Sequence, residues 1–167
     1  MPFSLHVSLV LTTLLVFSGC TTNNAFSRFH FTAVKEQAVA SLRTSKINLD
    51  NDVVGVVSSI YLNEVNPQKY NGMEYFYIAV YTKNKDILSD PNNIVGSNMV
   101  VKLNDALPVK IKKLDQKNEF EGLIALDNSW TSYYLVAFPV SQSDTLSLIL
   151  QDGKFGSLPL VYQKNEL

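Results

Sequence analysis

The sequence predicts an all-β domain, built as an antiparallel sandwich or barrel and preceded by a short helix. Eight short segments rich in Val, Ile, Leu and aromatic residues follow residue 50, with turn-forming Gly, Pro, Asn or Asp about every ten residues. Charged residues make up only 17% of the chain, with 14 Lys and Arg against 15 Asp and Glu. This composition fits a folded domain, and it lacks the clustered basic residues of a nucleic-acid-binding surface.

The first residues predict export and lipid attachment. An uncharged apolar run of 13 residues, 5–17, precedes a Ser-Gly pair and the single cysteine, Cys20. The run is shorter than the roughly 20 residues of a membrane-spanning helix, but it suits the apolar part of a signal peptide. Residues 16–20 resemble a lipobox, which implies removal of residues 1–19 and acylation of Cys20, with palmitate among the chains. The alternative is a plain secretory signal that leaves an unmodified thiol.

The same resemblance implies a location in the cell. Thr21 follows Cys20 at the position where an aspartate is the usual cue for retention in the inner membrane. We therefore expect the mature protein to be held on the outer membrane of a Gram-negative cell by its N-terminal lipid. Whether it faces the periplasm or the exterior is left open.

Residues 20–50 are expected to form a lipidated tether and a short helix. The spacing of Val34, Ala38 and Leu42 suits about three turns of an amphipathic helix. Thr32 precedes this pattern and is a residue type that caps helix N-termini. The helix is therefore predicted to begin just after Thr32.

Residues 51–167 are assigned to the β domain. Residues 73–82 alternate so that Tyr75, Tyr77 and Tyr81 share one face while Phe, Ile and Val share the other. Because both faces are apolar or aromatic, this segment is expected to be a central strand. The other predicted strands are 52–62, 94–103, 108–114, 118–126, 131–140, 145–151 and 157–162.

No residue is assigned a catalytic or metal-binding role, and no cofactor is expected. His30 is the only histidine left after cleavage, and it lies in the tether, which is a poor support for catalytic geometry. One histidine and a lipidated Cys20 cannot supply a zinc site. Residues 50–52 offer carboxylates but lack the other ligands of a calcium loop, so a solvated turn is the preferred interpretation.

Two groups of charged residues are interpreted as structural and not as functional sites. Glu119 and Glu121 stand two apart on a predicted strand, and an exposed face is favoured over an acid and base pair. Lys110, Lys112 and Lys113 interrupt an apolar strand. Lysines on an edge strand prevent pairing with another sheet, and that role is favoured over an anion site.

Aromatic residues are the more informative group for function, because Tyr and Trp favour protein interfaces. Most of the aromatic side chains are expected to fill the core. If some of them form a partner-binding patch, the candidates are Trp130 and Tyr133 near a strand start, with Tyr70 in a loop.

The domain resembles small immunoglobulin-like lipoproteins of bacterial envelopes. The resemblance is carried by YIAVYTKNKD at residues 77–86 and YYLVAFPV at residues 133–140. It implies a variant immunoglobulin-like β-sandwich of about seven to eight strands, without the two core cysteines of antibody domains. It also implies a role in adhesion or envelope interaction.

A second resemblance is to the outer-membrane lipoprotein of the type VI secretion membrane complex. It is carried by LNEVNP at residues 62–67 followed by the tyrosine-rich segment 77–81. It implies a lipidated β-sandwich that serves as a subunit of that complex.

The expected function is that of a non-enzymatic outer-membrane lipoprotein in protein–protein contact, in host-cell adhesion or in envelope assembly. Its partners are the membrane, through the lipid, and an unidentified envelope or host protein. The alternatives are the secretion-complex subunit and an envelope ligand-binding protein or enzyme.

Overall fold

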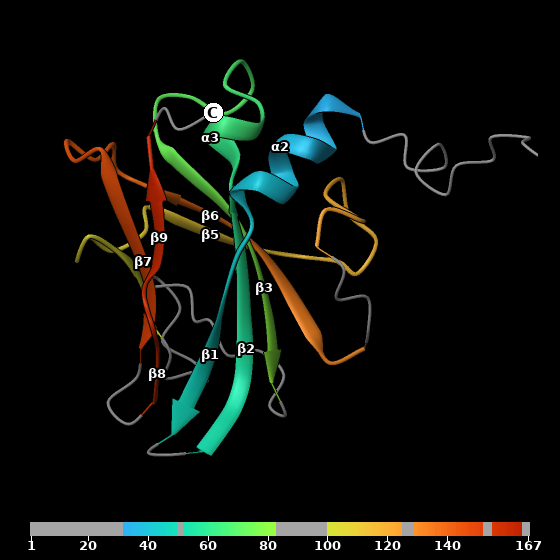
Figure 1. The fold of residues 1–167 in the computed structure, drawn as a ribbon, viewed down its shortest axis with the longest axis vertical. Coiled ribbons are helices and arrows are strands. Elements are labelled where there is room, and N and C mark those ends of the chain that lie inside the picture. The colour runs from blue at the N-terminus through green and yellow to red at the C-terminus, as the bar shows by residue number, and fades with distance from the viewer. Residues whose placement is uncertain (1–31, 50–51, 83–99, 125–128, 152–154, 165–167) are drawn as a thin grey trace, which may run out of the picture. The chain divides into compact units, whose positions relative to one another are not determined.

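The computed structural model describes residues 32–49, 52–82, 100–124, 129–151 and 155–164 (Figure 1). The signal segment, Cys20, the tether with His30, and positions 50–51 lie outside the described residues. In chain order, the described elements are α2 (Ala33–Ser41), β1 (Arg43–Leu49), β2 (Asp52–Tyr61), α3 (Leu62–Val65), β3 (Glu74–Thr82), β4 (Val100–Leu103), β5 (Lys110–Leu114), β6 (Thr131–Phe138), β7 (Thr145–Gln151), β8 (Phe155–Ser157) and β9 (Leu160–Gln163).

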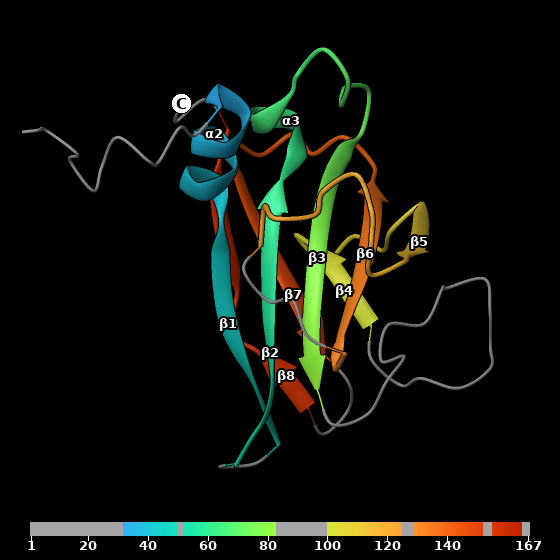
Figure 2. The same ribbon diagram turned by 90° about the vertical axis from the view of Figure 1, so that its right-hand side faces the viewer.

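The described strands form a single curled sheet, seen from the side in Figure 2. Its order is β4-β7-β8-β1-β2-β3-β6-β5, and β9 also pairs with β7. Every pair of neighbouring strands is antiparallel. The prediction of an antiparallel all-β fold is therefore confirmed, with nine strands among the described residues where about seven to eight were expected.

Strand β3 lies between β2 and β6 and is buried on both faces, as its sequence predicts. Phe76, Ile78 and Val80 point into one hydrophobic core. Tyr77 and Ala79 alternate with them and point into a second core on the opposite face. The domain is thus organised around one strand that serves two cores.

The first core, which we call the inner core, is enclosed by the curl of the sheet. Strands β2, β3 and β6 supply side chains from one side, and β4, β7 and β9 supply them from the other. Phe76 meets Phe138 edge-on, with ring centroids 5.9 Å apart, and it meets Tyr162 of β9 at 5.3 Å. Such edge-to-face contacts stabilise aromatic pairs beyond their area burial.

The second core, which we call the outer core, lies on the other face of β2, β3 and β6. It is covered by α2, α3 and residues 118–124. Tyr77 is stacked with Tyr133 at a centroid distance of 5.8 Å and with Phe120 at 4.7 Å. The buried members of this core are Ala38, Ile60, Leu62, Val65, Tyr70, Tyr77, Ala79, Phe120, Ile124 and Tyr133.

Helix α2 begins where the sequence predicts, and Thr32 Oγ1 accepts a hydrogen bond from the Lys35 backbone N–H. Only part of the predicted apolar face of the helix is buried. Ala38 is fully buried, Leu42 is half-buried, and Val34 is exposed. The helix contacts α3 and β2, and Val34 in its first turn is not part of the outer core.

Strand β1 occupies residues that the sequence analysis assigned to the tether and helix. It pairs along β2, with a register shift after Ile47. Nearby, β2 approaches β3 closely at Gly55. A Cβ there would lie 2.6 Å from Thr82 Cγ2 and 2.6 Å from the Tyr81 carbonyl oxygen. Glycine is therefore required by this close packing.

The prediction of a strand at residues 118–126 is wrong for its described part, because residues 118–124 form turns. Asn118 Oδ1 accepts from the Phe120 backbone N–H at 2.9 Å, and Gly122 has a positive φ of 82°. Side-chain bonds of this kind compete with strand pairing. Glu119 and Glu121 are exposed, as expected, and Glu119 is paired with Lys69.

Two further predicted strands are modified. The segment 157–162 is divided into β8 and β9 at Leu158-Pro159, since proline cannot donate a hydrogen bond to a strand ladder. The segment 94–103 contains β4 at its end, and residues 94–99 lie outside the described residues.

The lysine-rich strand β5 is the last strand of the sheet path, as expected for an edge. Lys110, Lys112 and Lys113 are all exposed. The edge position is thus confirmed, and the protective role of the lysines stays a prediction.

Candidate functional site

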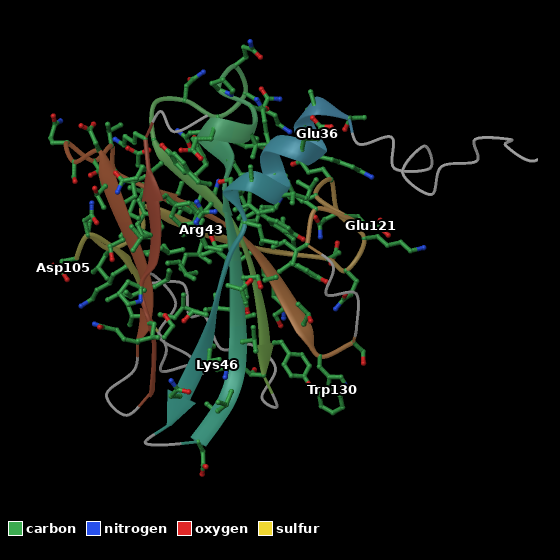
Figure 3. The ribbon with its side chains drawn as sticks, viewed as in Figure 1. Glu36, Arg43, Lys46, Asp105, Glu121 and Trp130 are labelled. Atoms are coloured by element: carbon green, nitrogen blue, oxygen red, sulfur yellow. The ribbon has the colours of Figure 1, made fainter. Side chains whose placement is uncertain are left out.

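The three aromatic residues proposed for partner binding do not share one surface in the structure. Tyr70 and Tyr133 are both buried in the outer core, where Tyr70 meets Phe120 at a centroid distance of 6.3 Å. Trp130 is 53% exposed (Figure 3). Of these three residues, only Trp130 is exposed in the folded domain.

A second exposed aromatic side chain lies near Trp130. Tyr81 is 40% exposed and stands directly opposite Thr131, the residue that follows Trp130. The backbone beside the tryptophan is fixed, because Thr131 is buried and its carbonyl oxygen accepts a hydrogen bond of 2.8 Å from Gln116 Nε2. We call Tyr81 and Trp130 the aromatic strand end.

The aromatic strand end lies far from the helices. Helix α3 follows β2 directly, at the end where Tyr61 pairs with Phe76 near the start of β3, and α2 packs against α3. Strand β3 then runs through nine residues to Thr82, a length of about 26 Å at the usual rise per residue. Tyr81 and Trp130 are therefore at the end of the sheet opposite α2 (Figures 1 and 3).

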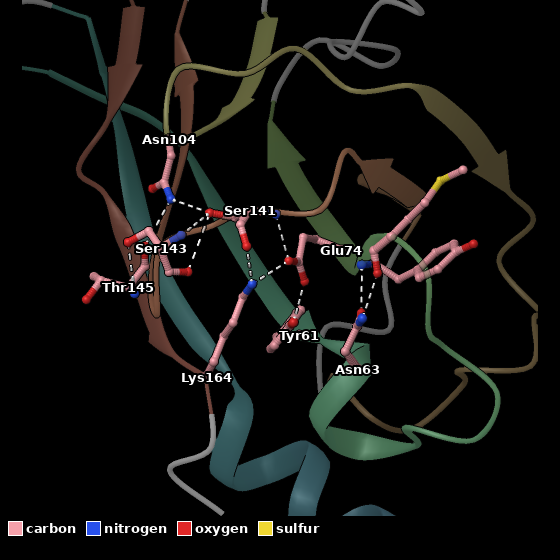
Figure 4. Close-up of polar contacts among 10 residues, drawn as sticks. Tyr61, Asn63, Glu74, Asn104, Ser141, Ser143, Thr145 and Lys164 are labelled. Carbon is pink, nitrogen blue, oxygen red and sulfur yellow. Dashed lines mark hydrogen bonds and ion pairs between the residues drawn. The ribbon is translucent and has the colours of Figure 1, made fainter.

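A buried polar cluster, the Glu74 clasp, lies at the opposite end of β3 (Figure 4). It consists of Tyr61, Glu74, Ser141 and Lys164. The Tyr61 hydroxyl donates to Glu74 Oε2 at 2.5 Å, and the Ser141 backbone N–H donates to Oε1 at 3.0 Å. Lys164 Nζ lies 2.7 Å from Oε1 and donates to the Ser141 carbonyl oxygen at 2.6 Å.

Two pKa values in the clasp are shifted in opposite directions. Burial favours the neutral form of Glu74, but the hydrogen bonds from Lys164, Tyr61 and Ser141 outweigh it together, so the pKa of this carboxyl is lowered. Burial, followed by the hydrogen bond to Glu74, raises the pKa of Tyr61. Near neutral pH the cluster therefore holds a carboxylate at Glu74 and a neutral phenol at Tyr61.

The chemistry of the clasp suits cross-linking of the fold better than catalysis. A carboxylate with a lowered pKa is a weak proton acceptor near neutral pH, and Glu74 accepts from three donors of the protein itself. Lys164 follows β9, Ser141 precedes β7, and Glu74 is the first residue of β3. The cluster therefore connects the end of β9 and the segment before β7 to the start of β3.

The described part of the chain contains no group of three or more His, Cys, Asp or Glu side chains arranged to hold a metal ion. None of its helices combines the length and the apolar character needed to cross a membrane.

Tyr81 and the clasp residues were missed as candidates by sequence reasoning. The sequence does contain a signal for the exposure of Tyr81. It is the last tyrosine of an alternating series, and it lies beyond the part of β3 that the outer core covers. Glu74 and Lys164 carry none, since they are far apart in the sequence and meet only in the fold.

Comparisons with models of protein families, with curated proteins and with solved structures found no match to this chain.

Proposed function

We propose that this protein is a non-enzymatic outer-membrane lipoprotein, anchored through Cys20, whose domain contacts a protein partner through the aromatic strand end. The observation that carries the proposal is the exposure of Tyr81 on β3 and of Trp130, which directly precedes the neighbouring strand β6. Exposed tryptophan and tyrosine are the residue types that most often dominate binding energy at interfaces.

The location of the two aromatic side chains supports the same proposal. The lipid would be attached before Thr32, and α2 begins directly after that residue. Tyr81 is near the end of β3 and pairs with the residue after Trp130, at the end of the sheet opposite α2; Figure 3 shows Trp130 there. The proposed tether therefore joins the domain at the end opposite the aromatic strand end, which leaves Tyr81 and Trp130 remote from the point of attachment and available to another envelope or host protein.

The immunoglobulin-like arrangement is part of the proposal. Its support is the way in which β4, β7 and β9 face β2, β3 and β6 across the inner core. Two groups of antiparallel strands with interleaved side chains between them are the essential feature of a β-sandwich.

The anchor is tested by the mass of the N-terminal peptide purified from membranes. We expect a cysteine at the new N-terminus that carries an acylated glyceryl group, and Cys20→Ala should move the protein from the membrane fraction to the soluble fraction. Cys20 lies outside the described domain, so thermal unfolding of the variant should match that of the wild type. An unmodified thiol, or unchanged fractionation of Cys20→Ala, would refute the anchor.

The contact surface is tested by photo-crosslinking in cells. A benzophenone amino acid in place of Trp130 should give a discrete adduct, and the same amino acid in place of Val34 is the matched control, because Val34 is also an exposed apolar residue. An adduct that depends on Tyr81, and disappears in Tyr81→Ala, would support one shared surface. Equal adducts from both positions, or none from position 130, would refute it.

A further inference from the structure

Strand β5 offers an open sheet edge within the described part of the chain. It pairs with β6 along one side, through five consecutive residue pairs, and it ends the sheet path. Ile111 packs against the inner core and Leu114 against the outer core, so the strand is held in place by both. Its other side presents backbone N–H and C=O groups that a further strand could use.

The charges on this edge are uncompensated by the neighbouring strand. Lys110 and Lys112 stand opposite Ala137 and Leu135, and they share one face of the sheet because side chains two apart in a strand point the same way. Both are exposed. Lys113 lies on the other face and already interacts within the domain.

The opposite edge of the sheet differs in two respects. Strand β4 is followed by a tight turn in which Leu103 and Ala106 exchange backbone hydrogen bonds of 3.0 and 2.8 Å. The chain therefore occupies part of that edge itself. Val101 and Leu103 are buried, and β4 has a single lysine, Lys102.

From these observations we infer that the β5 edge binds an extended acidic segment of a partner protein by strand addition. An added strand would place its side chains about 5 Å from those of Lys110 and Lys112. Acidic residues at alternate positions would then face both lysines, while the backbones pair. Pairing of two β5 edges from two copies of this chain is disfavoured, because it would bring like charges together.

The inference concerns a different surface from the aromatic strand end and does not rest on the proposed function. Trp130 precedes β6, and β5 pairs with β6 along the side away from β3. Variants of the aromatic strand end and variants of the β5 edge can therefore test the two proposals independently.

The test uses the ¹⁵N-labelled full chain in detergent micelles and a heptapeptide probe, acetyl-Thr-Glu-Val-Glu-Val-Glu-Thr-amide. Addition of the probe should shift the amide resonances of β5 (Lys110–Leu114) and slow their hydrogen exchange, because the new strand would shield their N–H groups. The same peptide with Gln in place of Glu should bind more weakly, and the peptide with Lys should not bind. Binding should also weaken as ionic strength rises.

A pair of matched variants separates edge binding from general charge attraction. Lys110→Gln with Lys112→Gln should weaken binding of the acidic probe by about tenfold, the effect of losing two cross-strand ion pairs. Lys35→Gln with Lys46→Gln removes the same charge from exposed positions on α2 and β1 and should leave binding unchanged. Absence of binding, equal effects of the two double variants, or shifts without slower exchange would each overturn the inference.

Discussion

Replacing Lys164 by methionine removes the ammonium of the Glu74 clasp while keeping an unbranched side chain that is only one atom shorter. Loss of one partner from a fully buried ion pair costs about 3–5 kcal/mol. The Lys164 side chain is 20% exposed, and the Tyr61 hydroxyl and the Ser141 N–H still donate to the carboxylate. We therefore expect Lys164→Met to lower the free energy of unfolding at pH 7 by about 2 kcal/mol, a shift of roughly 4–8 °C in Tm.

The loss of stability in Lys164→Met should depend on pH, and the lowered pKa of Glu74 sets the direction of that dependence. The folded pKa of Glu74 lies below its ordinary value of 4.5, so the folded state binds fewer protons than the unfolded state in the range between the two values. The stability that the clasp contributes is fully present above pH 4.5 and is lost as the pH falls through the lowered folded pKa. The gap between wild type and Lys164→Met should therefore be widest above pH 5 and should narrow toward pH 3.

Urea unfolding at several pH values measures both effects. The control is Lys69→Met, because the ion pair of Lys69 with Glu119 is exposed and should contribute less than about 0.5 kcal/mol. In a double-mutant cycle, Glu74→Gln and Lys164→Met should lose less together than the sum of their separate losses. The reasoning fails if Lys164→Met costs no more than Lys69→Met, or if its cost does not change with pH.

Three further predictions concern packing and exposure, and the first has a matched control. Gly55→Ala should cost about 1–3 kcal/mol because its Cβ overlaps backbone and side-chain atoms, whereas Gly156→Ala, which meets nothing closer than 4.0 Å, should change Tm little. Phe120→Ala should cost about 3–4 kcal/mol, as expected for a buried phenylalanine, and amide exchange should accelerate in residues 118–124 more than in β7. Trp130→Ala should cost clearly less stability than Phe120→Ala, since about half of Trp130 is exposed whereas Phe120 is buried; an equal loss in a melting curve would contradict the assignment of Trp130 to a contact surface.

Local patterns were enough to predict the elements whose stability is decided locally. Strand β3 was predicted with its two apolar faces, because alternation over a long segment is a strong signal. The start of α2 was predicted from Thr32, since capping is a contact between near neighbours. Both predictions needed no knowledge of distant residues.

The errors arise where distant contacts or side-chain bonds decide the structure. Strand β1 was missed because its residues are mostly polar, and it is held by β2 on one side and β8 on the other. The segment after Asn118 looked like a strand, but the Asn118 side chain bonds to its own backbone neighbours and turns the chain.

The same limit applies to the candidate sites. Tyr70 follows the turn at Asn66, and Asn71 donates to the carbonyl oxygens of Pro67 and Gln68, so the loop folds back and buries the tyrosine. A loop position alone could not predict that burial. Exposure of Trp130, by contrast, agrees with its position just outside a strand.

The position of β8 beside β1 has a consequence for when the domain can fold. A chain made from its N-terminus produces β1 and β2 early, but the second neighbour of β1 is not available until residues 155–157 have been made. Strand β7, which supplies three buried leucines to the inner core, also comes late. Pairing between strands so distant in sequence is slow. The nascent polypeptide therefore stays without its complete sheet until β8 and β9 have been synthesised, so β1 and the inner core lack their last partners during most of the synthesis of the domain.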